Sequence, residues 1–145
     1  MSNILIVGCG EFQRPLISMA QGWGHKVIGI DGDSSAPGAL EVDIFENVDL
    51  SAKEQALGVA SEHKVKAVIT AGTDFSTTVA YIANALNLPG IPYKTAYKMS
   101  HKFMMREALR KVHIPQPQPF AFVSSVDYLE TACLKVGFPD RKSVV

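Results

Sequence analysis

Residues 3–13 read NILIVGCGEFQ and join an apolar run to a glycine-rich turn. The run ends at Gly8, and such a run is typical of a strand buried on both faces of a parallel sheet. A helical pattern follows over about residues 13–23. Pro15 lies in its first turn, where the missing amide costs no helical hydrogen bond. The stretch therefore predicts the opening strand, turn and helix of an α/β fold.

The same alternation continues as far as about residue 95. Strands and helices take turns in the segments 26–30, 43–48, 52–62 and 67–70, with a further helix after residue 74. That helix carries Val79, Ile82, Ala83 and Leu86 at the spacing of one apolar face. Regular alternation of strands and helices favours a parallel sheet with right-handed crossovers. We therefore expect a Rossmann-like domain over residues 1–95.

A proline- and glycine-rich segment, Leu88–Pro92, marks the end of this domain. Beyond it the sequence predicts a helix over residues 101–112 and a strand over residues 120–123. The intervening residues 114–119 contain three prolines and must be extended, because proline lacks the amide that a helix needs. Ser124-Ser125-Val126-Asp127 has the pattern of a capping box for a last helix. Residues 96–139 thus form a second predicted segment.

The composition is that of a soluble globular protein with a real core. Of the 145 residues, 47% are hydrophobic, and 14 basic side chains balance 14 acidic ones. A neutral chain has no overall field that favours nucleic acid or an anionic membrane, and no apolar run reaches the roughly 20 residues of a membrane span. Cys9 and Cys133 lack metal-ligand or disulfide spacing, so we expect a cytoplasmic location with reduced thiols.

The turn at Gly8, Cys9 and Gly10 is the first candidate site. Glycines at this position let the backbone approach a phosphate, and Asp31 lies 23 residues after Gly8, where a dinucleotide-binding fold places its ribose-binding acid. However, Gln13 replaces the third glycine of that fingerprint and crowds the approach of a pyrophosphate. Three interpretations stay open: a structural turn, a dinucleotide site, and a turn that faces another ligand.

Two further motifs carry polar side chains at useful places. Thr73 or Asp74 could cap the following helix, or their loop could line a substrate crevice at the carboxyl edge of the sheet. Lys102 and Arg106 are four residues apart, so they share one helical face. They could bind an anion together or form a solvated basic face. The four histidines have no spacing typical of metal ligands.

Several of these segments, taken in order, resemble the N-terminal end of ATP-grasp ligases, close to the carbamoyl-phosphate synthase large chain and its carboxylate–amine ligase relatives. ILIVGCGEFQRPLI resembles the opening of the pre-ATP-grasp domain, and VIGIDGDSSAPG its second strand and loop. AVITAGTDFSTTVAYIANALNLPGI resembles its later strand and helix. HKFMMREALRKVHIPQPQ resembles the entry into the α+β ATP-grasp domain, and VGFP the approach to a lysine-bearing strand.

The resemblance implies a ligase that uses ATP and magnesium to activate a carboxylate, or bicarbonate, as an acyl phosphate. An amine or ammonia then attacks this intermediate. Lys102 matches the first basic position that contacts the nucleotide, and Arg106 is a supporting candidate that could instead brace the helix. The substrate-facing surface would contain Gly8, Gly10, Gln13, Asp31, Thr73 and Asp74. The partners implied are ATP and a small carboxylate, without nucleic acid or membrane, and a homo-oligomer is left open.

The chain departs from the family pattern after Pro139. Residues 140–145 read DRKSVV instead of an apolar strand with a second ATP-binding lysine. We expect these six residues to be a non-native tail, because they read like a translated sequencing adapter. The 96–139 segment would then be an incomplete ATP-grasp domain, and the fragment alone would be inactive. Two alternatives remain: an NAD(P)-dependent oxidoreductase, and a non-catalytic nucleotide-binding module.

Overall fold

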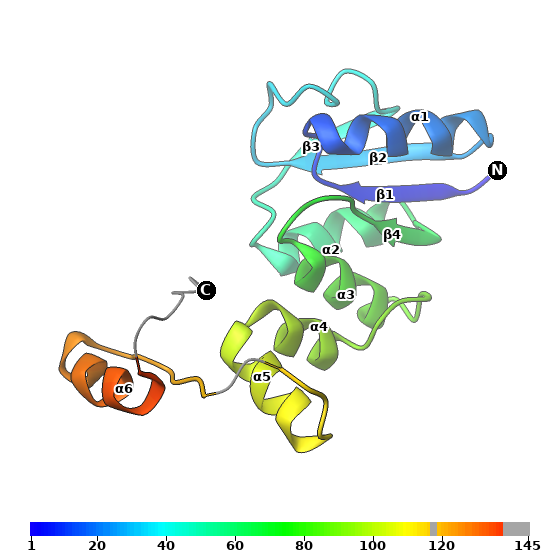
Figure 1. Cartoon of the computed structure of the whole chain (residues 1–145). Coiled ribbons are helices and arrows are strands. Elements are labelled where there is room, and N and C mark those ends of the chain that lie inside the picture. Colours follow the sequence, from blue (N-terminus) through cyan, green and yellow to red (C-terminus); the bar gives the residue numbers. More distant parts are fainter. Residues whose placement is uncertain (117–118, 138–145) are drawn as a thin grey trace. The chain divides into compact units, whose positions relative to one another are not determined.

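The computed structural model describes residues 1–116 and 119–137, and it divides into two compact units (Figure 1). Unit 1 is Met1–Ala96, and unit 2 begins at Tyr97. The elements of unit 1 are β1 (Asn3–Val7), η1 (Glu11–Gln13), α1 (Arg14–Gly22), β2 (Lys26–Asp31), β3 (Ile44–Asn47), α2 (Lys53–Glu62), β4 (Ala67–Ile69) and α3 (Ser76–Ala85). Helix α4 (Tyr93–Ser100) spans the boundary. Unit 2 continues with α5 (Lys102–Lys111), η2 (Val126–Tyr128) and α6 (Leu129–Val136).

The strands of unit 1 form one parallel sheet in the order β3-β2-β1-β4. Strand β1 is central, and its Ile6 lies opposite Gly29 of β2 and Ile69 of β4. The predicted α/β fold with a Rossmann-like parallel sheet is therefore confirmed. Because these strands run parallel, the carboxyl ends of β1, β2 and β4 lie at the same edge.

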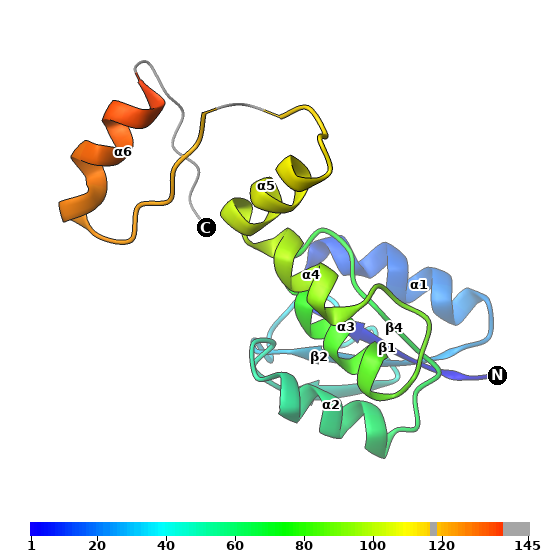
Figure 2. The same ribbon diagram turned by 90° about the horizontal axis from the view of Figure 1, so that it is seen from below.

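The two faces of β1 pack against different helices because successive side chains of a strand point in opposite directions. Leu5 and Val7 share a core cluster with buried side chains of α2 and α3. Ile6 points the other way and packs with Ile17 and Ala20 of α1. Figures 1 and 2 show α1 on one side of the sheet and α2 and α3 on the other. This double coverage explains why the run in β1 is apolar at every position after Asn3.

Helix α4 was not predicted from the sequence. It begins where the carbonyl of Pro92 accepts hydrogen bonds from the amides of Thr95 (2.8 Å) and Ala96 (3.1 Å). Only Ala96 is buried in this helix. A single small buried side chain gives too narrow an apolar stripe to indicate a helix.

Two predictions for unit 2 are wrong. Residues 120–123 do not form a strand, because a strand needs a neighbour to share its hydrogen bonds and the described residues of unit 2 contain no second strand. The capping box at Ser124–Asp127 is also not formed. Ser125 precedes the 3₁₀ turn η2 without a side-chain cap, and its carbonyl accepts the amide of Tyr128 at 3.2 Å. Phe138 and the expected tail at residues 140–145 lie outside the described residues.

The described side chains of unit 2 bury little apolar surface. Phe103 of α5 contacts Phe120 and Phe122, with ring centroids 5.8 Å and 5.3 Å apart. Helix α5 has no buried residue, and α6 has only Ala132. Among the described helices of both units, none combines the length and the apolar character that a membrane crossing requires.

Candidate functional site

The carboxyl edge of the sheet brings three loops of unit 1 together. The first follows β1 at Gly8, which has a φ of +93° and donates its amide to Ile30 O at 2.8 Å. The second loop follows β2, and the third follows β4. In the third loop, Thr70 Oγ1 donates to Val7 O at 2.6 Å. These bonds fix the ends of β1, β2 and β4 against one another, at the edge where parallel α/β sheets bind ligands.

Asp31 ends β2 and organises two of these loops. Its Oδ2 accepts the amide of Cys9 at 2.7 Å, and its Oδ1 accepts the amide of Asp33 at 2.9 Å. Each carboxylate oxygen therefore already has a backbone donor. The acid that the dinucleotide interpretation assigns to a ribose instead holds the turn after β1 and the turn after β2 in place.

Gln13 occupies the space above the glycine turn. It is buried, and its Nε2 donates to the carbonyl of Ala71 after β4. A Cβ atom on Gly8 would lie 3.4 Å from Gln13 Cδ, and one on Gly10 would lie 3.2 Å from Gln13 Oε1. The side chain thus fills the place where a pyrophosphate would approach the third glycine of a dinucleotide fingerprint. The predicted crowding is present, and this geometry disfavours dinucleotide binding.

Cys9 belongs to the same turn, but its thiol is not placed to react. Its side chain is fully buried. Burial, with a smaller contribution from the negative charge of Asp31, raises the pKa of the Cys9 thiol to about 12. A thiol with this pKa stays protonated near neutral pH and is a poor nucleophile. Its role is to pack.

The loop after β2 also belongs to the candidate site, although the sequence did not identify it as such. Gly38 donates its amide to Cys9 O at 2.7 Å. A Cβ at Gly38 would lie 2.8 Å from Ile17 Cδ1 and 2.9 Å from Cys9 O, so only glycine fits there. Gly38 itself was the sequence signal that could have indicated this loop. Cys9, the residue that it contacts, is 29 positions away in the sequence, so the contact could not be predicted.

Thr73 and Asp74 do not cap α3. The N-cap residue of that helix is Phe75, which makes no side-chain cap bond. Thr73 Oγ1 instead accepts the amide of Phe75 at 3.3 Å, within the loop that precedes the helix. Asp74 is exposed. The capping interpretation is therefore wrong, and a substrate-facing role for this loop stays a prediction.

Lys102 and Arg106 lie in unit 2, on the first turns of α5. Lys102 is exposed at the start of the helix. Arg106 is half-buried, with its guanidinium carbon 5.7 Å from the centroid of the Phe120 ring. Its carbonyl accepts Gln116 Nε2 at 2.7 Å. This environment favours the bracing role for Arg106 and leaves Lys102 as the more available cation.

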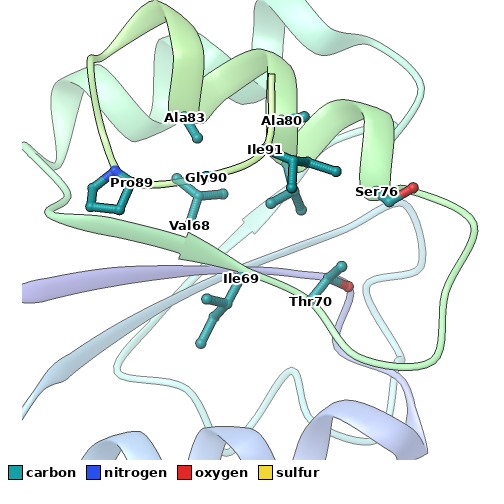
Figure 3. Close-up of a pocket in the computed structure, with 10 residues that line it drawn as sticks. Val68, Ile69, Thr70, Ser76, Ala80, Ala83, Pro89, Gly90 and Ile91 are labelled. Atoms are coloured by element: carbon teal, nitrogen blue, oxygen red, sulfur yellow. The ribbon is translucent and has the colours of Figure 1, made fainter. Parts of the chain in front are cut away.

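A hollow of about 250 Å³ lies elsewhere in unit 1, between β4, α3 and residues 89–91 (Figure 3). Its wall is mostly apolar and includes Val68, Ala80 and Ile91, and none of the predicted site residues lines it. In the described part of the chain, no three His, Cys, Asp or Glu side chains are placed to hold a metal ion. The polar candidate site is therefore the carboxyl edge rather than this hollow.

Comparison with known proteins gives relatives over almost the whole chain. No family model matches. The chain is 25% identical over 142 residues to a formate-dependent phosphoribosylglycinamide formyltransferase of Rhodococcus jostii, and the match covers 95% of this chain and 35% of that protein. A formate-dependent phosphoribosylglycinamide formyltransferase of Bacteroides thetaiotaomicron is 26% identical, with 96% and 36% covered. The chain therefore spans about a third of the length of these curated relatives.

Solved structures give the same picture of the fold. A phosphoribosylglycinamide synthetase from Anaerococcus prevotii superposes with a TM-score of 0.77 at 22% identity, covering 95% of this chain and 35% of that one. An N5-carboxyaminoimidazole synthetase from Staphylococcus aureus, complexed with ADP, superposes with a TM-score of 0.78 at 18% identity, covering 95% and 36%. The predicted resemblance to the N-terminal part of ATP-grasp ligases is confirmed. The finer likeness to the carbamoyl-phosphate synthase large chain stays a prediction.

Proposed function

We propose that this chain, which resembles the N-terminal part of ATP-grasp ligases, supplies the substrate-facing domain and the first nucleotide contact of such a ligase. The parent enzyme would activate a carboxylate as an acyl phosphate, which an amine then attacks. The observation that carries the proposal is the carboxyl edge of unit 1, where a glycine turn, a 3₁₀ helix start and the 71–74 loop meet.

The amine substrate would carry a phosphoribosyl group. The names of the Rhodococcus jostii and Anaerococcus prevotii proteins both contain phosphoribosylglycinamide. In this chain, the amides of Glu11 and Phe12 are the first two of a helical segment. No carbonyl of that segment is placed to accept their hydrogen bonds. Such amides suit a phosphate. Gln13 and Asp31 would then hold the neighbouring loops in place through their hydrogen bonds rather than contact the phosphate.

The nucleotide would meet unit 2 at Lys102. Its ammonium group is exposed at the start of α5, and phosphoryl transfer depends on cations arranged around the phosphates. Arg106 would brace α5 against Phe120. Magnesium would neutralise phosphate charge in the parent ligase, but the described residues offer no ligand cluster for it, so we assign no metal step to this chain. The chain alone would not hydrolyse ATP, because one lysine cannot supply the several cations that must surround the phosphates.

Titration of the ¹⁵N-labelled chain with magnesium–ADP tests the nucleotide contact. We expect the largest amide shifts at residues 101–106 and a loss of at least about fivefold in affinity in Lys102→Ala, in line with a charge-assisted contact of roughly 1 kcal/mol or more. Lys111→Ala removes an exposed lysine from the last turn of the same helix and is the matched control. Equal affinities in the two variants, or shifts confined to unit 1, would contradict the assignment of Lys102.

A further inference from the structure

Helix α1 carries an exposed apolar strip on a flank that does not face the core. The strip consists of four residues spaced three or four positions apart: Phe12, Pro15, Met19 and Trp23. This spacing places side chains on one side of a helix. Phe12 belongs to η1, and Trp23 directly follows α1. Phe12, Met19 and Trp23 are 75%, 51% and 73% exposed. We call these four residues the α1 strip.

The strip runs along the side of the sheet that α1 covers. Of the described helices that belong wholly to unit 1, α2 and α3 lie on the opposite side (Figures 1 and 2). Ile69 of β4 points away from α3 (Figure 3) and packs against the core cluster of α1, yet it is only half-buried, as is Leu16 beside the strip. A Cβ at Gly72, just after β4, would lie 3.4 Å from Phe12 Cβ. The apolar surface therefore continues from the strip toward β4.

The strip is apolar where a solvated helix would carry polar or charged side chains. Arg14 is the one charged residue of α1, and it is not part of the strip. Its Nη1 donates to Glu11 Oε1 at 2.8 Å, and its Nε donates to Glu41 Oε1 at 2.7 Å. Aromatic residues and methionine are enriched in protein interfaces, and contiguous exposed apolar surface marks a site of association. The strip has the composition of an interaction surface.

Charge and symmetry favour a second copy of this chain as the partner. The 14 basic side chains balance the 14 acidic ones, so two copies approach without net repulsion, and the strip has no charge to attract an acidic or basic partner. Aromatic rings stand at both its ends, about 16 Å apart along the helix axis. Two antiparallel strips related by a two-fold axis therefore place Phe12 of each copy against Trp23 of the other. This arrangement also opposes the two helix dipoles favourably.

The exposed area of the strip is sufficient for a weak dimer. Aromatic side chains have roughly 150–250 Å² each, so the exposed parts of Phe12 and Trp23 amount to about 300 Å² per copy. With Pro15, Met19 and the half-buried Leu16, two copies would bury about 1,000 Å², which is the lower end for a specific interface. We therefore expect dissociation in the micromolar range.

We propose that the α1 strip is the contact surface of a two-fold symmetric homodimer in which the two α1 helices pack antiparallel. The inference goes beyond the proposed function and does not rest on it. It uses the outer flank of α1, whereas the proposed function uses the carboxyl edge of the sheet and Lys102.

Sedimentation equilibrium of the full chain measures the dimer. We expect a monomer–dimer equilibrium with a dissociation constant on the order of 10 μM. Met19→Lys buries an unpaired charge in the middle of the contact and should weaken the dimer about tenfold or more. Ser18→Lys is the matched control, because it adds the same charge to an exposed position of the same helix that lies off the strip. This control should keep the dimer.

Trp23 is the single tryptophan of the chain, so its fluorescence reports directly on the contact. Its emission should move to shorter wavelength as the concentration rises through the dimer range, because the second copy excludes water from the ring. Phe12→Ala should reduce this shift, since Phe12 of the other copy covers Trp23. Leu134→Lys changes an 81% exposed side chain of α6 and should leave both the shift and the dimer intact.

A chain that sediments as a monomer at every concentration overturns the inference and leaves the strip to the rest of the parent ligase. Equal dissociation constants in Met19→Lys and Ser18→Lys, or a dimer lost only in Leu134→Lys, also overturn it, because the contact would then lie elsewhere. Trp23→Ala is a second test should Met19→Lys fail to fold. It truncates an exposed side chain and should weaken the dimer about tenfold, as expected for a tryptophan at the centre of a contact.

Discussion

Gln13 shows how one side chain changes the chemistry of a common fold. The preceding glycines and Asp31 match a dinucleotide fingerprint, and only the third glycine is missing. The replacement is buried and ties the turn after β1 to the loop after β4. At the same time, Asp31 uses its two oxygens on backbone amides. These hydrogen bonds link the loops of the carboxyl edge, and the geometry disfavours a pyrophosphate at the turn.

Cys9 predicts a pH dependence of stability that can be assigned to one residue. Burial, and to a smaller extent Asp31, raise the pKa of its thiol to about 12, whereas an ordinary thiol titrates near 9.0. Between these values the unfolded chain releases a proton that the folded chain keeps. The free energy of unfolding therefore falls as pH rises, by up to about 1.4 kcal/mol per pH unit. Below pH 9 both states are protonated, and the contribution is constant.

The variant Cys9→Ala lacks this titration, so the stability gap between it and the unmodified chain should shrink as pH rises from 8.5 to 10.5. Urea unfolding at several pH values in this range measures the gap. Cys133→Ala is the control, because that thiol is only partly buried and the variant should keep the slope of the unmodified chain. Parallel pH profiles for Cys9→Ala and the unmodified chain would show that the thiol ionises equally in both states.

Most of the strands and helices of unit 1 could be predicted from the sequence because they have local signals. Apolar runs marked β1, β2 and β4, and the stripe that includes Ile82 and Ala83 marked α3. The missed or wrong elements depend on distant partners instead. Helix α4 has one buried residue, and the expected strand at residues 120–123 has no neighbour among the described residues. In the candidate site, the positions of Gly8 and Asp31 followed from strand ends, but the contact of Gly38 with Cys9 required the fold.

The start of α4 is fixed by a polar cluster on α2 and α3 that no sequence pattern indicated. Asn84 Oδ1 accepts the amide of Tyr93 at 2.9 Å, and Asn84 Nδ2 donates to Ile91 O at 3.1 Å. Lys53 Nζ donates to the Tyr93 hydroxyl at 2.7 Å, and the Tyr81 and Tyr93 rings meet edge to face at 5.5 Å. These contacts connect three helices and determine where the chain leaves unit 1.

We expect Asn84→Ala to lower the free energy of unfolding by about 1 kcal/mol, since it removes two hydrogen bonds at a partly hydrated site. Amides of residues 91–95 should also exchange faster with solvent. Asn84→Asp keeps the acceptor for Tyr93 but turns a carboxylate oxygen toward Ile91 O, so the amide of Tyr93 should stay protected although stability still falls. Urea unfolding and hydrogen exchange measure the two effects. A Tyr93 amide that exchanges as fast in Asn84→Asp as in Asn84→Ala would show that the acceptor contributes nothing.

At the scale of the whole chain, the two units differ in how much apolar surface they bury. Among the described residues, every buried apolar side chain except Ala132 belongs to unit 1, and Ala132 itself is 9% exposed. In unit 2, Phe122, Leu129 and Leu134 are 59%, 49% and 81% exposed. Burial of apolar surface is the main favourable contribution to folding. Unit 1 should therefore be the cooperative core, and unit 2 should open locally.

Hydrogen exchange separates this view from the alternative of a complete, non-catalytic binding module. Amides of β1 and β2 should exchange only through global unfolding, while those of α5 and α6 should exchange roughly 100-fold faster or more, because local opening costs less than global unfolding. A shortened chain ending at residue 96 should keep the slow exchange of β1 and β2. Equal protection across both units would instead favour the module, since a single cooperative domain protects all its helices alike. The outcome bears directly on the ligase proposal, in which Lys102 is carried by a segment that gains its packing partners from the rest of an ATP-grasp domain.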